Sequence, residues 1–296
     1  MSESIHPDTT IGAVHLTVSN LARSLSFYQQ ALGFIVHRRE GDTAHLGAGG
    51  PAQQEAGGPD LLVLTQRSDA RRARGTTGLY HFAVLVPSRL ELAQSLRRIG
   101  ETRTPVQGFS DHLVSEAIYL SDPDDNGIEI YRDRPRGEWP HLDGQLQMAT
   151  DPLDVDGVLA ELNGHDEPWR GLHPQTVIGH VHLHVADIAK AEAFYCGVLG
   201  FDLMLRYGSS ASFVSAGGYH HHIGLNTWAG VGAPPPPPDA IGLRYFVVRL
   251  PNGVELSRVA DRVRQAGSDR KETQEGMFVR DPSQNGVLLA ATAMDE

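Results

Sequence analysis

The chain has 296 residues, 40% of them apolar and 21% charged, so it is long enough for about two globular domains and its composition excludes disorder. A formal charge of -11 argues against nucleic acid or an anionic membrane surface as a partner, and without a run of about 18 apolar residues or a cationic-apolar N-terminus we expect neither a membrane span nor a secretory signal. The single Cys196 can form no internal disulfide, which favours the reducing cytoplasm.

The first feature along the chain is an internal repeat. Residues 11–34, IGAVHLTVSNLARSLSFYQQALGF, match residues 178–201, IGHVHLHVADIAKAEAFYCGVLGF, without a gap. Each copy has the alternating pattern of a strand and then the apolar spacing of a helix, and shorter copies begin at residues 78 and 242. Further strands follow each copy, so we predict four strand–helix–three-strand modules. Their bounds are 8–68, 76–135, 177–230 and 239–293, with a linker that contains a short helix at 136–176.

Segments rich in Gly, Pro or positive charge interrupt and join these modules. Residues 47–59 are a predicted Gly/Pro loop inside module 1, and residues 65–78 are a basic, solvated loop between modules 1 and 2. The helix of the linker is predicted around LDVDGVLAEL. The prolines at 230–240 cannot donate the hydrogen bonds of a sheet, so we interpret this tract as a rigid polyproline II spacer between modules 3 and 4.

Residues 110–131 hold the polar side chains that most need an explanation. Tyr119 lies in the predicted strand EAIYL, and Glu129 lies in the next predicted strand, GIEIY, after the turn sequence DPDDNG. Glutamate is depleted in strands and is rarely buried unless it is paired or bound to a metal, so Glu129 indicates a cationic partner. The alternative for Glu129 alone is an outward-facing position on an amphipathic edge strand.

The repeats align the four modules with one another. The first-strand positions are Ala13, His81, His180 and Tyr245, and the last-strand positions are Leu61 or Leu62, Glu129, the run His220–His222, and Leu288. Donor side chains occupy these positions only in modules 2 and 3, whereas solvated histidines would be scattered over all four. We interpret His15 as structural, with a triad of His15, His81 and Glu129 as the alternative. We expect His182 and His184 to line the cavity, because alternate residues of a strand share a face with His180, and His182 is also a candidate to join the metal site.

These segments resemble those of the vicinal oxygen chelate superfamily, the glyoxalase, bleomycin resistance and dioxygenase proteins. Over nearly its full length the chain resembles the type I extradiol catechol dioxygenases within that superfamily. GHVHLHVADIAKAEAFYCGVLGF is similar to the segment that begins with that family's first metal histidine, which gives this role to His180, and GLYHFAV resembles the strand of the second, His81. YHHHIGL is similar to the strand with the acid–base histidine, which falls on His221.

His112, Tyr119 and Glu129 match the family's signature of a histidine, an aliphatic–tyrosine pair, Asp-Pro and a glutamate. The departures are Ser110 and Asp125, where Gly is more usual, and they concern the shape of the loops rather than the chemistry. The resemblance implies an α+β fold in which four βαβββ modules pair into two half-open β-barrels.

The function that the resemblance implies is that of an iron(II) enzyme, with manganese as the alternative metal, that cleaves a catechol-type ring next to the diol with O2. His81, His180 and Glu129 would hold the metal, because two imidazoles and one carboxylate leave positions open for substrate and oxygen. His221 would take a proton from the substrate and return it, while His112 and Tyr119 would stabilise the charge on a ring oxygen.

Two other functions stay open: a non-oxidative metalloenzyme of the same superfamily, such as a glyoxalase-like isomerase or lyase, and a small-molecule binding protein. The isomerases of this superfamily resemble one another in having two carboxylates among their metal ligands. Module 3 of this chain instead offers histidines in its last strand. A pure binding protein has no obvious need for His112 and Tyr119.

The positions of the donors also predict how the modules pair. Tandem pairing of module 1 with 2 and of module 3 with 4 would separate His81 and Glu129 from His180 and His221. Pairing module 2 with module 3 reunites them and leaves modules 1 and 4 as a metal-free barrel. The connection at 134–177 is long enough for this crossing within one chain or for an exchange between two chains of a homodimer.

Overall fold

The computed structural model describes residues 4–49, 58–165 and 167–292 of the chain. The chain folds into two compact units. One consists of Thr17–Ala70 and His81–Ile178, and the other of Met1–Leu16, Arg71–Tyr80 and Gly179–Glu296.

The first repeat has the predicted strand–helix–three-strand order. Helix α1 begins after Asn20, whose side chain accepts the N–H of Arg23 at 2.9 Å, as expected for an N-cap residue. Residues 50–57 of the predicted Gly/Pro loop lie outside the described residues. The elements of this repeat are β1 (Thr10–Val18), α1 (Leu21–Gln30), β2 (Ile35–Glu40), β3 (Thr43–Gly47) and β4 (Leu62–Gln66).

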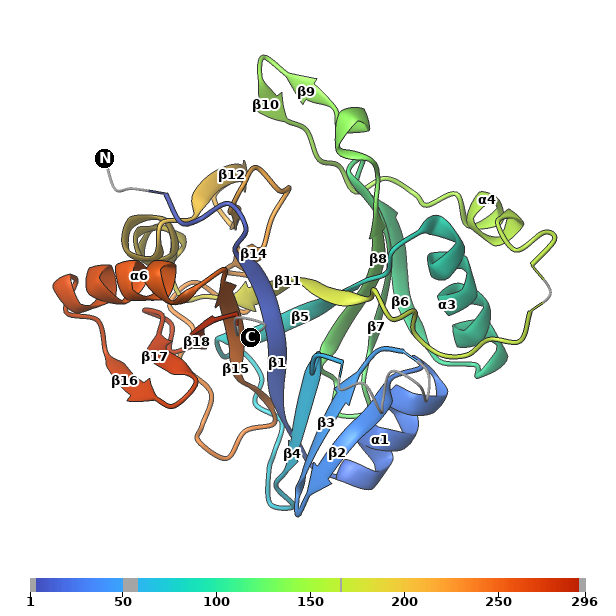
Figure 1. Cartoon of the computed structure of the whole chain (residues 1–296), viewed down its shortest axis with the longest axis horizontal. Coiled ribbons are helices and arrows are strands. Elements are labelled where there is room, and N and C mark those ends of the chain that lie inside the picture. The colour runs from blue at the N-terminus through green and yellow to red at the C-terminus, as the bar shows by residue number, and fades with distance from the viewer. Residues whose placement is uncertain (1–3, 50–57, 166, 293–296) are drawn as a thin grey trace. The chain divides into compact units, whose positions relative to one another are not determined.

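The second repeat follows the same plan, and its helix lies against the strands that follow it (Figure 1). Ser88 caps this helix by accepting the N–H of Glu91 at 3.2 Å. The predicted strands EAIYL and GIEIY are confirmed, and they pair antiparallel with Tyr119 opposite Glu129. The elements are β5 (Gly78–Leu85), α3 (Arg89–Glu101), β6 (Val106–Asp111), β7 (Ser115–Ser121) and β8 (Gly127–Asp133).

The linker after the second repeat contains a small hairpin and the predicted helix. Asp143 and Gly144 connect the two hairpin strands with φ angles of 52° and 76°, the left-handed conformation that a type I′ turn requires. The helix around LDVDGVLAEL is confirmed, and Asp154 caps it. The elements are η1 (Arg136–Glu138), β9 (His141–Leu142), β10 (Gln145–Leu146) and α4 (Val155–Ala160).

The third repeat departs from the predicted plan at two points. Its helix continues from α5 (Ile188–Glu192) as a π-helix, η2 (Ala193–Leu199), a wider turn that is frequent at functional sites. Its last strand begins only at Ile223, so the prediction that His220–His222 lie in that strand is wrong: they lie in the bend before it. The other strands of the repeat are β11 (Val177–His184), β12 (Asp202–Tyr207), β13 (Ala211–Ser215) and β14 (Ile223–Asn226).

The fourth repeat is regular. Its helix is capped by Asn252, which accepts the N–H of Glu255 at 3.0 Å. Within the described residues, no helix combines the length and the apolar character that a membrane crossing needs. The elements are β15 (Gly242–Leu250), α6 (Gly253–Gln265), β16 (Arg270–Thr273), β17 (Gly276–Arg280) and β18 (Gly286–Ala291).

The longer strands form two curled sheets of eight, which confirms the predicted α+β class with two half-barrels (Figure 1). One sheet has the order β16-β17-β18-β15-β1-β4-β3-β2, and the other has the order β12-β13-β14-β11-β5-β8-β7-β6. The strands of the second and third repeats therefore occur in one sheet and those of the first and fourth in the other, as the positions of the donors predict.

Among the described residues, each unit has a buried tyrosine–aspartate hydrogen bond, and the two bonds lie at equivalent places in the repeats. Tyr28 donates to Asp122 at 2.9 Å, and Tyr195 donates to Asp281 at 3.1 Å. Burial, and then the neighbouring carboxylate, raise the pKa of each phenol well above its usual range, so both stay hydrogen-bond donors. Each aspartate also accepts backbone N–H groups of its own turn. These hydrogen bonds attach the Asp-Pro turn before β8 to helix α1, and the Asp-Pro turn before β18 to helix η2.

Candidate metal centre

His81 and Glu129 come together because parallel strands β5 and β8 are neighbours. Their registry places Ala83 beside Glu129, and the His81 Nε2 atom lies 3.0 Å from the Glu129 Oε2 atom. Only 8% of the His81 side chain and 3% of the Glu129 side chain are exposed. The outward-facing alternative for Glu129 is therefore wrong. A carboxylate at this depth needs a cationic or hydrogen-bonding partner, because burying an isolated charge is very costly.

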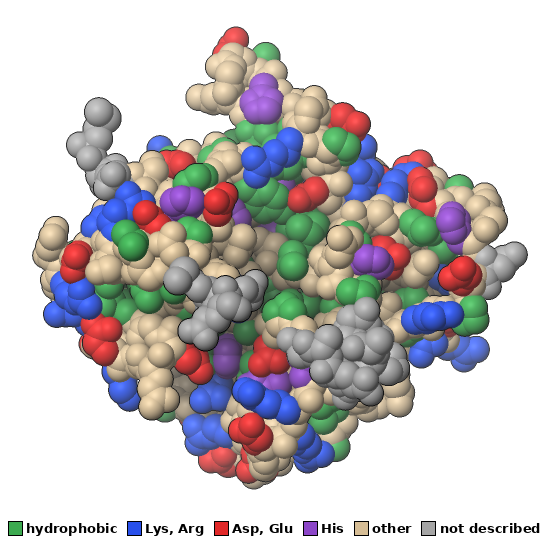
Figure 2. Space-filling model, viewed as in Figure 1, with side chains coloured by type: hydrophobic (Ala, Val, Ile, Leu, Met, Phe, Trp, Pro, Cys, Tyr) green, Lys and Arg blue, Asp and Glu red, His purple; other side chains and the backbone are tan. Residues whose placement is uncertain are grey.

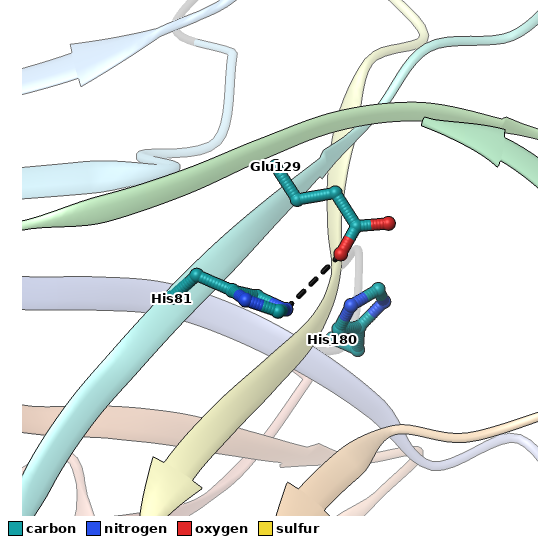
Figure 3. Close-up of side chains that lie close together, drawn as sticks. All are labelled: His81, Glu129 and His180. Carbon is teal, nitrogen blue, oxygen red and sulfur yellow. Dashed lines mark ion pairs between the residues drawn. The ribbon is translucent and has the colours of Figure 1, made fainter. Parts of the chain in front are cut away.

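His180 of β11 completes a cluster of three buried donors (Figure 3). One ligand atom from each of His81, Glu129 and His180 lies within 4.8 Å of the other two, and the three side chains point toward one another. Within the described residues, the cluster of candidate metal ligands that meets this distance includes His180. His15 is not part of that cluster. Two imidazole nitrogens and one carboxylate oxygen are a donor set that suits a divalent transition metal with open coordination positions.

His112 and Tyr119 form a hydrogen-bonded pair near this cluster. The His112 Nε2 atom lies 2.6 Å from the Tyr119 hydroxyl, and the Tyr119 ring centroid lies 5.7 Å from that of His81. His112 does not lie within a strand but in the turn between β6 and β7. Its Nδ1 atom lies 2.6 Å from the carbonyl oxygen of Ala149. A carbonyl only accepts, so Nδ1 carries the proton, and in the neutral ring Nε2 accepts from the Tyr119 hydroxyl.

His221 stands beside His180, with 4.1 Å between their ring centroids. A regular strand would turn His220 away from His221, but the bend places their Nδ1 atoms 2.7 Å apart. His222 has a different environment: its Nδ1 atom lies 2.9 Å from the Ser215 hydroxyl and accepts the N–H of Ala216 at 3.2 Å. The geometry therefore separates His222, which holds the bend, from His221, which faces the candidate ligand.

Two further strand histidines, His15 and His182, pack against aromatic rings. His15 stacks on Tyr245, with centroids 4.0 Å apart and planes inclined by 19°. His182 contacts Phe213 at 5.6 Å and Trp228 at 5.4 Å between ring centroids. Sequence reasoning did not single out Phe213 and Trp228, because an isolated aromatic residue carries no signal of the side chains that it will contact.

On the face shown in Figure 2, Lys and Arg side chains are interspersed with Asp and Glu side chains, so opposite charges lie near one another there.

The fold consists of two curled sheets built from βαβββ repeats, and it carries a cluster of two histidines and one carboxylate. These features place the chain in a class of proteins that build candidate metal sites on a common scaffold. The chain belongs to the Glyoxalase/Bleomycin resistance protein/Dioxygenase superfamily, whose model matches residues 10–130 and 177–289.

Particular relatives make the similarity more specific. The chain is 49% identical over 283 residues to the catechol-2,3-dioxygenase of Bacillus subtilis (strain 168), a match that covers 94% of this chain and 96% of that protein. The crystal structure of a putative dioxygenase from Bacillus subtilis subsp. subtilis str. 168 is similar with a TM-score of 0.62 at 16% identity, over 95% of this chain and 85% of that one. Glyoxalase I from Zea mays gives a TM-score of 0.57 at 14% identity, over 96% and 92% of the two chains. The two structural similarities concern the fold alone.

Proposed function

We propose that this chain is an iron(II)-dependent extradiol dioxygenase that cleaves a catechol-type ring next to its diol with O2. The observation that carries the proposal is the cluster of His81, Glu129 and His180 in a chain 49% identical to a catechol-2,3-dioxygenase. These three residues would hold the metal, with manganese as the alternative ion. When bound, the metal would supply Lewis-acid chemistry for the diol and a redox centre for O2.

Burial supports this role for the three residues. The site excludes most water, so the carboxylate of Glu129 gives one negative charge that offsets part of the charge of a divalent ion. The two imidazoles add nitrogen donors without adding charge. A catechol that has lost one proton brings the second negative charge, and the complete set then balances the ion.

His112 and Tyr119 would hold the substrate oxygen and stabilise the negative charge that develops on it. Their contact of 2.6 Å fixes the His112 ring and the Tyr119 hydroxyl relative to each other. Polar groups that are already oriented need little rearrangement when charge appears on a bound oxygen, which is a main source of electrostatic stabilisation in enzymes.

His221 would accept a proton from the diol and later return it. Its Nδ1 atom lies 2.7 Å from the Nδ1 atom of His220, and one N–H group must lie between these two nitrogens. The other nitrogen of His221, Nε2, is then the atom that exchanges a proton with the substrate. A histidine suits this task because its charge changes near neutral pH.

The non-oxidative alternative is less favoured by the donor set. Within the described part of the chain, the cluster holds one carboxylate and two histidines rather than the two-carboxylate set expected for an isomerase. The similarity to glyoxalase I from Zea mays concerns the fold, so it supplies no argument for that activity.

The location that we propose is the cytoplasm. Burial, together with the negative charges of Glu192 and Asp202, raises the pKa of the Cys196 thiol to about 11. A thiol that stays protonated at neutral pH is a poor nucleophile, which fits a structural role for Cys196. The proposal of a reducing compartment rests on the single cysteine, which can form no internal disulfide.

Oxygen consumption tests the proposed function directly. The full chain loaded anaerobically with iron(II) should consume O2 and catechol mole for mole and produce a yellow semialdehyde acid. His180→Ala is the control that keeps the fold of the scaffold while removing one ligand. Disappearance of catechol without O2 uptake, or no reaction across a panel of substituted catechols, would contradict the proposal.

A further inference from the structure

The turn that carries His112 is held in an unusual backbone conformation. Leu113, the next residue, has a φ angle of 67°, in the left-handed region that is unfavourable for a residue with a side chain. The Asp111 Oδ1 atom accepts the N–H of Leu113 at 2.9 Å, and the N–H of His112 donates to the Ser115 carbonyl at 2.8 Å. Asp111 therefore stabilises the conformation on which the direction of the His112 side chain depends.

Asp111 is fixed from two further directions. Arg134 donates from Nη2 to the Asp111 Oδ2 atom at 2.6 Å, and its backbone N–H donates to the Val114 carbonyl at 2.8 Å. The backbones of Asp111 and Asp151 exchange two hydrogen bonds of 2.8 and 2.9 Å. These contacts tie the turn both to the end of β8 and to the linker segment that follows the small hairpin.

Arg134 is in turn part of a buried ionic network. One of its nitrogens lies 3.5 Å from Glu116, of which only 2% is exposed. Burial would raise the pKa of Glu116, but hydrogen bonds from Arg89 and Arg132 outweigh it and hold this pKa below its usual range. Glu116 therefore stays negative, and the arginines around it form a rigid base for the Asp111–Arg134 pair.

The linker segment tied down by Asp151 contains the carbonyl that selects the tautomer of His112. Ala149 lies two residues before Asp151, and its oxygen lies 2.6 Å from the Nδ1 atom of His112. If His112 lost its hydrogen bond to that oxygen, the proton could reside on Nε2 instead, and His112 would then donate to the Tyr119 hydroxyl oxygen rather than accept from it. The direction of the hydrogen bond between His112 and Tyr119 therefore depends on how the His112 turn is held beside segment 149–151.

We propose that Asp111, supported by Arg134, is a positioning residue for His112. Its side chain holds the turn that carries His112, so that Nδ1 keeps its hydrogen bond to the Ala149 carbonyl and Nε2 remains the acceptor for Tyr119. This role deepens the proposed function and rests on it only for its kinetic consequence. The tautomer itself is a property of the folded chain.

The test uses full-length protein labelled with nitrogen-15 at histidine. The nitrogen resonances of His112, assigned by their loss in His112→Gln, report which ring nitrogen carries the proton. Wild type should show a proton on Nδ1, and Asp111→Ala should show a mixture of tautomers. In the iron-loaded protein kcat should fall about 10- to 100-fold, the range seen when a group that orients an active-site histidine is removed, with KM for catechol changed far less.

Several variants separate positioning from simple stabilisation of the turn. Asp111→Asn keeps an acceptor for the Leu113 N–H but loses the charge that faces Arg134, so it should restore part of kcat. Arg134→Gln should shift the tautomer in the same direction and is the second variant if Asp111→Ala does not fold. Asp261→Ala removes an Asp–Arg pair of 2.7 Å on the surface of α6 and should change neither readout.

Two outcomes would overturn the proposal. One is a His112 tautomer identical to wild type in folded Asp111→Ala and in Arg134→Gln. The other is a shifted tautomer with kcat unchanged in an active enzyme. If wild type cleaves no catechol, the proposed function fails, but the tautomer measurement on the same protein still decides whether Asp111 positions His112.

Discussion

Removal of the Tyr28 hydroxyl should destabilise the protein by an amount that the structure allows us to work out. Tyr28 is fully buried, and its hydroxyl donates to the Asp122 Oδ2 atom at 2.9 Å. A hydrogen bond to a charged group contributes about 1.5–3 kcal/mol. The amide of Asn126 donates to the same oxygen at 2.8 Å and stays in place in Tyr28→Phe, so we expect a loss of about 1.5 kcal/mol, the lower end of the range.

The assay is thermal and urea unfolding of the metal-free protein at pH 7. A loss of about 1.5 kcal/mol should lower Tm by about 3–6 °C, given about 2–4 °C per kcal/mol for chains of this size. Tyr195→Phe should cost a similar amount, because Asp281 Oδ2 also keeps an amide donor, from Asn285 at 2.9 Å. Tyr207→Phe is the control, since Tyr207 is 65% exposed. A Tyr28→Phe protein within about 0.5 kcal/mol of wild type, the usual scatter of surface substitutions, would refute the reasoning.

The pH dependence of this loss has a definite sign. Burial raises the pKa of Asp122, and hydrogen bonds from Asn126 and Tyr28 offset part of that rise. Tyr28→Phe therefore raises the folded-state pKa of Asp122 further and leaves the unfolded value unchanged. By linkage, the stability difference between wild type and variant is fully present above the variant's Asp122 pKa and is lost as pH falls through the wild-type value. A difference that grew on acidification would contradict this assignment.

The remaining predictions concern the candidate site. Alanine at any of the three candidate ligands should abolish binding of iron, measured by metal analysis after gel filtration, while His15→Ala keeps full occupancy; full iron content in His180→Ala with loss in His15→Ala would reverse the assignment. Tyr119→Phe and His221→Ala should keep the metal but lower kcat by about 10²–10⁴-fold, and near-normal turnover in either would remove that residue from the mechanism. Chelation should end O2 uptake, and added iron(II) should restore it further than manganese(II), whereas the reverse order would make manganese the working metal.

Local sequence patterns were sufficient for the modules and for most of their strands. A period of two residues followed by a helical period depends only on neighbours in the chain, so the repeats reveal the strand–helix–strand plan without any tertiary information. For Glu129 alone the sequence left two environments open, a buried position with a cationic partner and an outward-facing position on an edge strand, and the structure shows the buried one. The comparison of equivalent repeat positions then singled out His81 and His180 beside it.

Tertiary structure alone decided which distant groups meet. Whether His15 or His180 joins His81 depends on the order of strands in a sheet, which many pairings of the same modules would satisfy locally. The late start of β14 follows from the hydrogen bonds that His222 makes with Ser215 and Ala216, partners that no periodicity predicts. The contact between the Ala149 carbonyl and the His112 ring was the one that the sequence could predict least. Every residue has a carbonyl, and only the folded path of the backbone brings this one to the ring.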